Sequence, residues 1–249
     1  MYIGMRRLRF YILALATVCA VACAEEAPKS TLPEFETFVY ENYEEGNYAI
    51  TISYERIKNT STKRAYAIID SINYHTTFGE YALESRNLQQ TAERVAAETI
   101  KSMGYYNTDD MVGEMHLYQV ASLLRNNTVI CYDTVMETNF GGIYPIVSNT
   151  YECYDIASGN AYDFSYLADG EWVDALQSAI YAKLVDTYGD DLMLPSAAAV
   201  FIPSTIYLTD TGLAFQYQPY EVGAPDIGNV SVEFSDAELE AVGAPIVWE

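Results

Sequence analysis

Short segments in which hydrophobic and polar residues alternate recur along the chain, and they limit the folds open to it. The clearest is residues 48–54, where Tyr, Ile, Ile and Tyr occupy every second position. A period of two is typical of a β-strand with one buried face. Similar segments flank Asn126-Asn127 and Asp210-Thr211-Gly212, two turn sequences that predict β-hairpins.

Other segments have the period of a helix. Hydrophobic residues recur every three or four positions over residues 84–103 and again over residues 172–187. Residues 65–74 are ambiguous, and their pattern favours a strand. Ser235 and Glu238 have the spacing of a capping box, which predicts a short final helix. Together these segments predict an α+β fold, with antiparallel sheet or sheets, two main embedded helices and a short C-terminal helix.

The turn at Gly141-Gly142 sets an expected strand register. If its flanking strands pair about Gly142, Cys131 and Cys153 lie opposite each other and form a disulfide near the open end of one hairpin. A slip of one residue would instead place the cysteines on opposite faces as two buried thiols. In the chain-entropy model a disulfide closing a loop of this length contributes about 3 kcal/mol.

The N-terminus has the parts of a secretory signal. Arg6, Arg7 and Arg9 precede an apolar run over residues 10–22, which is shorter than the roughly 20 residues of a spanning helix. Small residues then lead to Cys23, an arrangement that resembles the lipobox of bacterial lipoproteins. Cys19 is the poorer candidate because Val18 precedes it. The alternative is an ordinary signal peptide cleaved after a small residue.

This N-terminal pattern predicts an exported protein anchored by a lipid, such as palmitate, on Cys23. Ala24-Glu25-Glu26 resembles the acidic signal that directs Bacteroidetes lipoproteins to the cell surface. We therefore expect a signal peptide over residues 1–22, a flexible tether over residues 23–40, and a location in the outer membrane or at the cell surface.

The chain is strongly acidic, with 13 basic and 35 acidic side chains and a net charge of −22. Removing the three arginines that precede residue 23 leaves 10 basic and 35 acidic side chains, a net charge of −25. Such a surface repels nucleic acid, so we exclude nucleic-acid binding. It attracts cationic proteins or divalent cations, although acidic surfaces also simply keep extracellular proteins soluble.

Sequence motifs give no support for catalysis. His75 and His116 are the only histidines, and neither has metal-ligand spacing with another histidine or a cysteine. The carboxylate pairs Glu44-Glu45, Asp109-Asp110 and Asp190-Asp191 are adjacent in sequence, whereas two-carboxylate chemistry places its acids across a cleft. We expect no catalytic residue, no metal site and no cofactor.

Tyrosine is abundant, and 23 tyrosines is a heavy load for 249 residues. Tyrosine supplies rigid amphipathic contact area, which suits recognition of protein or glycan. The alternative is that tyrosines fill half-exposed sheet faces. The cluster considered consists of Tyr105, Tyr106, Tyr151, Tyr154, Tyr162, Tyr166, Tyr207, Tyr217 and Tyr220.

The order of these elements resembles the extracellular region of RsiV-type proteins and the N-terminal region of PdaC-type deacetylases. The turn over residues 141–145 is similar to the Gly-Gly-Ala-His-Pro turn of that family, with Tyr144 in place of His. Residues 212–222, with sequence GLAFQYQPYEV, are similar to its C-terminal signature. The resemblance implies an N-terminal subdomain over residues 41–165 and a C-terminal subdomain over residues 166–249.

The resemblance has limits for function. We expect neither a cytoplasmic sigma-factor-binding region nor a deacetylase domain, so we do not carry those activities over. What the resemblance implies is a non-enzymatic extracytoplasmic binding module whose partner is a cationic protein such as lysozyme. Two alternatives stay open: an enzyme that acts on glycan or cell wall through a carboxylate pair, and a structural envelope component.

Overall fold

The computed structural model describes residues 32–104, 113–140, 145–224 and 227–248. Cys23 and the turn at Gly141-Gly142 lie outside these residues. Leu32–Glu249 forms one compact unit. No helix in the described ranges is long and apolar enough to cross a membrane.

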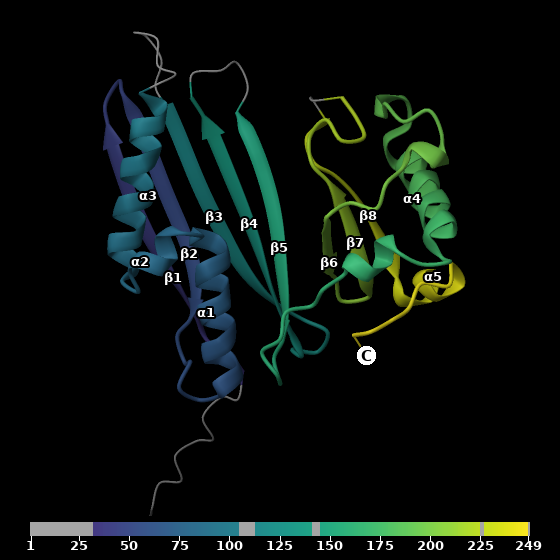
Figure 1. Cartoon of the computed structure of the whole chain (residues 1–249), viewed down its shortest axis with the longest axis horizontal. Coiled ribbons are helices and arrows are strands. Elements are labelled where there is room, and N and C mark those ends of the chain that lie inside the picture. Colours follow the sequence, from purple (N-terminus) through teal and green to yellow (C-terminus); the bar gives the residue numbers. More distant parts are fainter. Residues whose placement is uncertain (1–31, 105–112, 141–144, 225–226, 249) are drawn as a thin grey trace, which may run out of the picture. The chain divides into compact units, whose positions relative to one another are not determined.

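A five-stranded sheet occupies the N-terminal half of this unit (Figure 1). Its strands follow their sequence order: β1 (Phe35–Glu44), β2 (Tyr48–Ile57), β3 (Gly113–Leu124), β4 (Val129–Asn139) and β5 (Ile146–Asp155). Neighbours are antiparallel except β2 and β3, which are parallel. Parallel neighbours need a crossover connection, and the helices between β2 and β3 provide it.

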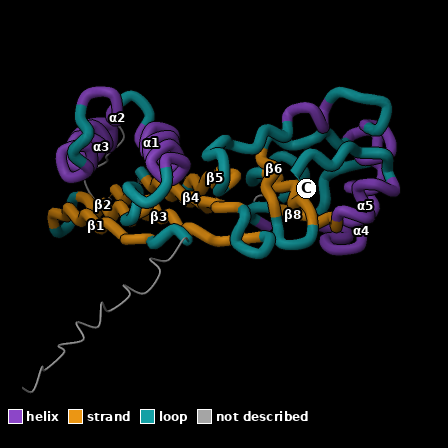
Figure 2. Tube along the Cα trace, turned by 90° about the horizontal axis from the view of Figure 1, so that it is seen from below, coloured by secondary structure: helices purple, strands orange, loops and turns teal. Residues whose placement is uncertain are grey.

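Three helices cover one face of this sheet (Figure 2). They are α1 (Arg64–Phe78), α2 (Tyr81–Glu84) and α3 (Leu88–Met103). The buried face of β2, with Ile50, Ile52 and Tyr54, packs against Phe78 of α1 and Ala92 of α3. The alternating residues that predicted this strand therefore also form part of the hydrophobic core.

A buried polar network lies between α1 and the sheet. Asn73 and Gln119 are 1% and 2% exposed, and their side-chain amides exchange hydrogen bonds of 3.1 and 3.0 Å. Gln119 also donates to the hydroxyl oxygens of Thr77 and Thr134 at 3.0 and 2.9 Å. These bonds offset the cost of burying two amides.

A three-stranded antiparallel sheet forms the C-terminal half. Its strands are β6 (Thr205–Leu208), β7 (Gly212–Tyr217) and β8 (Val230–Ser235), and its helices are α4 (Val173–Tyr188) and α5 (Asp236–Ala241). Three 3₁₀ turns occupy Ser165–Ala168, Gly189–Asp191 and Ala197–Ala199. The core contains Leu176, Ile180 and Leu184 of α4 together with all three strands. It also includes Cys131 and Cys153 from β4 and β5, so hydrophobic packing continues between the halves.

The predicted α+β class is confirmed, including the capping box of Ser235 and Glu238 at the start of α5. Two sequence predictions were wrong in detail. Residues 65–74 belong to α1, where buried Asn73 interrupts the apolar face and hides the helical period. The tether does not extend to residue 40, because β1 begins at Phe35. The predicted antiparallel pairing holds for all described strand neighbours except β2 and β3. The subdomain boundary at residue 165 stays a prediction.

Candidate binding groove

The β4–β5 hairpin has one constant register. Residue numbers of opposed positions sum to 284, from Val129 opposite Asp155 to Thr138 opposite Ile146. Cys131 and Cys153 face each other and form a disulfide, with their Cα atoms 4.1 Å apart. Antiparallel partners this close, about 4.5 Å, are those that do not hydrogen-bond to each other. The backbone groups of Cys153 therefore point away from β4.

The outer edge of β5 exposes every second backbone position. At Cys153 the carbonyl accepts from the N–H of Tyr162 at 2.8 Å, and at Asp155 the N–H donates to the Asn160 carbonyl at 2.9 Å. The same alternation turns the N–H and C=O groups of Val147, Asn149 and Tyr151 outward. Among the described residues, Val147 has no backbone hydrogen-bond partner on this edge.

The side-chain amide of Gln218 occupies this edge at Asn149. Its Oε1 accepts from the Asn149 N–H at 3.3 Å, and its Nε2 donates to the Asn149 carbonyl at 2.9 Å. Nε2 also lies 3.3 Å from Oγ1 of Thr205 in β6. Gln218 is held in turn by Glu221, whose Oε2 accepts from the Gln218 N–H at 2.7 Å. One amide thus bridges the edge strands of both sheets.

Next to this bridge lies a groove of about 980 Å³. Its described lining consists of residues 145–150 on β5 and its approach, 204–205, 218–220 and 228–229. The walls carry two large exposed side chains, Ile146 and Tyr220, which are 72% and 71% exposed. Tyr220 has a φ of 74°, in the left-handed region that a bulky residue rarely adopts. It is also the sole ionisable side chain in the described lining.

Two lining asparagines carry unsatisfied polar atoms. The Oδ1 atoms of Asn149 and Asn229 are buried without a hydrogen-bond partner in the described part of the chain. Buried polar atoms are normally paired, because an unmade hydrogen bond costs about 1–3 kcal/mol. Both atoms are acceptors that are shielded from solvent, so a ligand in the groove reaches them only if the asparagine side chains rotate.

Beyond the groove, the two sheets meet through a pair of tyrosines. Tyr151 of β5 stacks on Tyr207 of β6 with ring centroids 3.7 Å apart. Burial, followed by the nearby Tyr207 and Asp133, raises the pKa of Tyr151 well above its usual value. Burial also raises the pKa of Tyr207. Both phenols therefore stay neutral at physiological pH, and the stack adds an uncharged contact between the sheets.

A second, smaller cavity of about 230 Å³ lies at α1 and β2. Its charged lining consists of Arg56, Asp70 and Arg86, with His75 beside them. The Arg56 guanidinium lies 3.3 Å from the Asp70 carboxylate. Burial raises the pKa of Asp70, while the Ile57 N–H and Arg56 act in the opposite direction. This cavity contains one carboxylate in its described lining.

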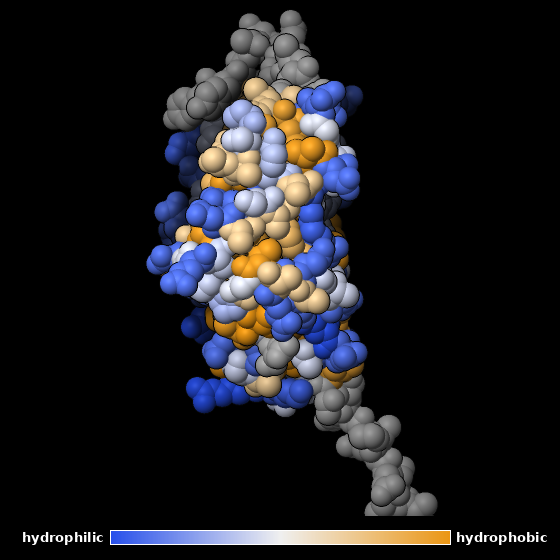
Figure 3. Space-filling view, turned by 90° about the vertical axis from the view of Figure 1, so that its right-hand side faces the viewer, coloured by the Kyte–Doolittle hydropathy of each residue, from blue (hydrophilic) through white to orange (hydrophobic). Residues whose placement is uncertain are grey.

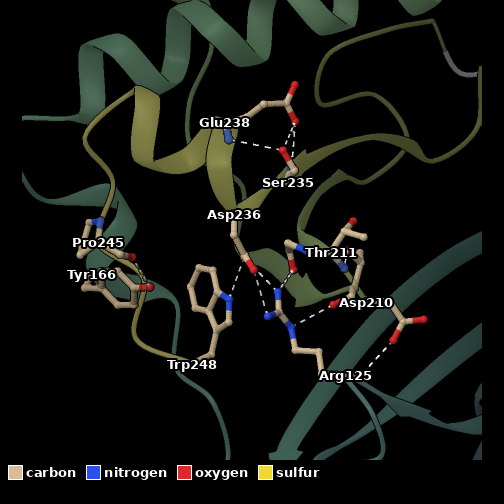
Figure 4. Close-up of polar contacts among 11 residues, drawn as sticks. Arg125, Tyr166, Asp210, Thr211, Ser235, Asp236, Glu238, Pro245 and Trp248 are labelled. Atoms are coloured by element: carbon tan, nitrogen blue, oxygen red, sulfur yellow. Dashed lines mark hydrogen bonds and ion pairs between the residues drawn. The ribbon is translucent and has the colours of Figure 1, made fainter.

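A polar cluster around Arg125 joins the β3–β4 turn to the C-terminal sheet (Figure 4). The Arg125 side chain donates to both carboxylate oxygens of Asp236 and to the carbonyls of Thr209 and Gly212. Its backbone N–H donates to Asp210 at 2.8 Å. The Trp248 indole donates to Asp236 at 3.0 Å, and its ring lies 5.7 Å from the guanidinium carbon. These contacts connect the N-terminal and C-terminal sheets beside the start of β4, at the end of that strand away from the groove.

The cysteine, histidine and carboxylate residues considered from the sequence do not come together in one site in the described part of the chain. Cys23, Asp109 and Asp110 lie outside the described residues. Glu44-Glu45 ends β1 at a turn, and Asp190-Asp191 lies in a 3₁₀ turn. His116 lies on β3 and stacks on Tyr118. No group of three metal-ligating side chains occurs in the described ranges, and neither cavity has two carboxylates in its described lining.

Most members of the tyrosine cluster fill the interior. Tyr154 and Tyr217 are fully buried, and Tyr162 and Tyr166 are partly buried against the C-terminal core. Tyr105 and Tyr106 lie outside the described residues. Tyr220 is the member that lies exposed in the groove. Figure 3 views the side that carries α4 and α5, where hydrophobic and hydrophilic side chains are interspersed.

Solved structures resemble this chain, whereas neither the family models nor the curated sequences do. No protein-family model and no curated protein matches the sequence. A DUF3298 family member from Bacteroides fragilis NCTC 9343 is similar in structure, with a TM-score of 0.67 and 15% identity over 85% of this chain and 96% of that one. The chain has a DUF3298 fold.

A second structure agrees. A DUF3298 family protein from Pseudomonas aeruginosa PAO1 matches 84% of this chain and 93% of its own length, with a TM-score of 0.60 and 10% identity. Identities this low show the shared DUF3298 fold alone. The finer resemblance to RsiV-type and PdaC-type proteins stays a hypothesis.

The sequence patterns did not predict the groove. The groove depends on Gln218 and Asn229, which lie far from β5 in sequence and carry no recognisable motif. The available signal was the exposed segment that follows β7, where the sequence Gln-Pro-Tyr combines a turn residue with an aromatic one.

Proposed function

We propose that this chain is a non-enzymatic lipoprotein of the bacterial cell envelope, anchored through Cys23, that binds a cationic protein outside the cytoplasm. Lysozyme is the partner that the RsiV-type resemblance names. The groove carries this proposal. It combines an exposed tyrosine and isoleucine with uncharged hydrogen-bonding groups, a composition typical of protein recognition surfaces.

Charge supports a cationic partner. A net charge of −25 for residues 23–249 follows from the sequence, and a field of this sign accelerates the encounter with a basic protein. Charge alone gives no specificity, so the groove has to supply it. Calorimetric titration of residues 24–249 with hen lysozyme tests this: saturable heat at physiological salt supports the proposal, and its absence contradicts it.

Two rival functions make different predictions. A glycan-acting enzyme needs two carboxylates across one cleft, and the smaller cavity offers Asp70 alone in its described lining. A structural envelope component would co-purify with a stable membrane partner and would give no heat with any soluble ligand. Chemical cross-linking in intact cells followed by mass spectrometry separates a stable membrane partner from a transient soluble one.

The anchor has its own test. Cells expressing the chain and fed an alkyne-tagged palmitate should incorporate the tag into the wild type and not into Cys23→Ala. Labelling of Cys23→Ala would show that a residue other than Cys23 is acylated. Cys19→Ala is the matched control and should be labelled like the wild type.

A further inference from the structure

We infer that the outer edge of β5 at Val147 accepts an extended peptide segment bearing basic side chains, which adds to the five-stranded sheet as a further strand. The inference deepens the proposed function, on which it rests for the positive charge of the ligand.

The first observation is the unpaired backbone. The constant register of β4 and β5 turns the Val147 N–H and C=O away from β4, and no described backbone group pairs with them. A free strand edge is a template for another strand, and extended peptides bind such edges through main-chain hydrogen bonds. The next outward position toward the hairpin turn is Pro145, which offers a carbonyl only.

The second observation is that this edge already binds an amide. Gln218 gives Asn149 the two hydrogen bonds that a neighbouring strand would give, one accepted and one donated. The spacing beside β5 therefore fits a peptide group at Asn149. A ligand strand that pairs with Val147 would end at Gln218, which limits the pairing to a few residues.

The third observation is the chemistry of the walls. Ile146 and Tyr220 offer exposed apolar surface to alternate side chains of a bound strand. The hydroxyls of Ser148 and Thr150, which also belong to the lining, can accept hydrogen bonds from a lysine or arginine side chain.

Nearby charges have the matching sign. Glu137 lies directly opposite Val147 in the β4–β5 register, and Glu221 holds the Gln218 backbone. No basic side chain belongs to the described lining of the groove. These carboxylates border the groove and do not belong to its described lining, so they attract a strand with alternating basic residues at longer range and repel an acidic one.

Fluorescence anisotropy of residues 24–249 with a fluorescein-labelled Lys-Val-Lys-Val-Lys peptide, acetylated and amidated, tests this at physiological salt. Three comparisons separate strand addition from charge attraction. The same peptide with N-methylated backbone amides keeps its charge and loses its edge donors. Val147→Pro removes the edge N–H, at a position where an edge strand tolerates proline, and Val147→Ala retains it.

We expect the N-methylated peptide and Val147→Pro each to bind about tenfold more weakly, as the loss of edge hydrogen bonds implies, and Val147→Ala to bind within about twofold of the wild type. Circular dichroism checks that Val147→Pro is folded, and the N-methylated peptide needs no variant. Equal binding of both peptides to the wild type, or no binding of either, would overturn the inference.

Lysozyme titrations distinguish failure here from failure of the proposed function. If the peptide binds in the expected pattern and lysozyme does not bind, the edge site stands and the proposed partner is wrong. If lysozyme binds the wild type and Val147→Pro equally and the peptide does not bind, the proposed function stands and the edge site is wrong.

Discussion

The Arg125 guanidinium donates to both carboxylate oxygens of Asp236, at 3.1 and 3.0 Å, and so joins the β3–β4 turn to the start of α5. The Arg125 side chain is only 14% exposed and the Asp236 side chain 31%. A fork-shaped, partly buried pair of this kind is stronger than an ion pair on the surface. The two residues are 111 positions apart in sequence, so this contact has no local signature.

Arg125→Ala should lower the free energy of unfolding by about 3 kcal/mol, because it removes the counter-charge of a partly buried carboxylate and one donor from each of two carbonyls. Urea denaturation followed by circular dichroism measures the change. Lys101→Ala, which removes an exposed ion pair with Glu98, is the matched control and should cost less than about 0.5 kcal/mol. Equal effects of the two variants would contradict a special role for Arg125.

The Asn73–Gln119 amide pair should show strong coupling. Either Asn73→Leu or Gln119→Leu alone leaves a buried amide without its partner, and we expect each to cost about 2–3 kcal/mol. The double variant should cost less than the sum of the two, because both amides are gone. A double-mutant cycle from urea denaturation measures this coupling, and simple additivity would contradict it.

Reduction of the Cys131–Cys153 disulfide should lower the free energy of unfolding by about 3 kcal/mol, the value that the chain-entropy model gives for a separation of 22 residues. Denaturation curves with and without a phosphine reductant measure the difference. A double variant, Cys131→Ala with Cys153→Ala, should not respond to the reductant. Titration of two free thiols in the untreated, unfolded wild type would show that the bond is not formed.

Glu238 should make stability depend on pH in the acid range. The hydrogen bond from Lys183, followed by those from the backbone and hydroxyl of Ser235, lowers the pKa of Glu238 from 4.5 to about 2. A lowered pKa in the folded state means that the stabilisation is complete above pH 4.5 and is lost as the pH falls toward 2.

Glu238→Gln should therefore lower the free energy of unfolding by about 0.5–1 kcal/mol at neutral pH, the usual value of a helix cap at an exposed site. The difference from the wild type should shrink as the pH falls from 4.5 to about 2. Urea denaturation at neutral pH and near the acid end of this range measures it. Glu240→Gln, an exposed position on the same helix, is the control, and a pH-independent difference at Glu238 would contradict this account.

The sequence predicted those features that depend on local pattern. The alternation in β2, the periodicity of α3 and α4, and the capping box of α5 each act over a few residues and appear in the fold. The β4–β5 register also follows the expected sum, because a turn fixes the pairing of the strands that it joins.

Features that depend on distant partners were not predicted. The α1 helix was missed because Asn73 on its buried face is satisfied by Gln119 of β3, which lies 46 residues away. The β1 strand is a half-exposed, acidic edge whose alternation is weak. The groove needs Gln218 beside Asn149, a contact across 69 residues. A sequence pattern that spans a few residues contains no information about partners so far apart in the chain.

Specific recognition of lysozyme is tested by calorimetric titration of residues 24–249 with hen lysozyme at increasing salt, beside cytochrome c as an equally basic control. Recognition through the groove predicts micromolar or tighter binding of lysozyme that persists at physiological salt, while cytochrome c binding disappears, since salt screens exposed charges beyond about 8 Å. Loss of both signals at physiological salt, or equal heats for both proteins, would contradict specific recognition of lysozyme.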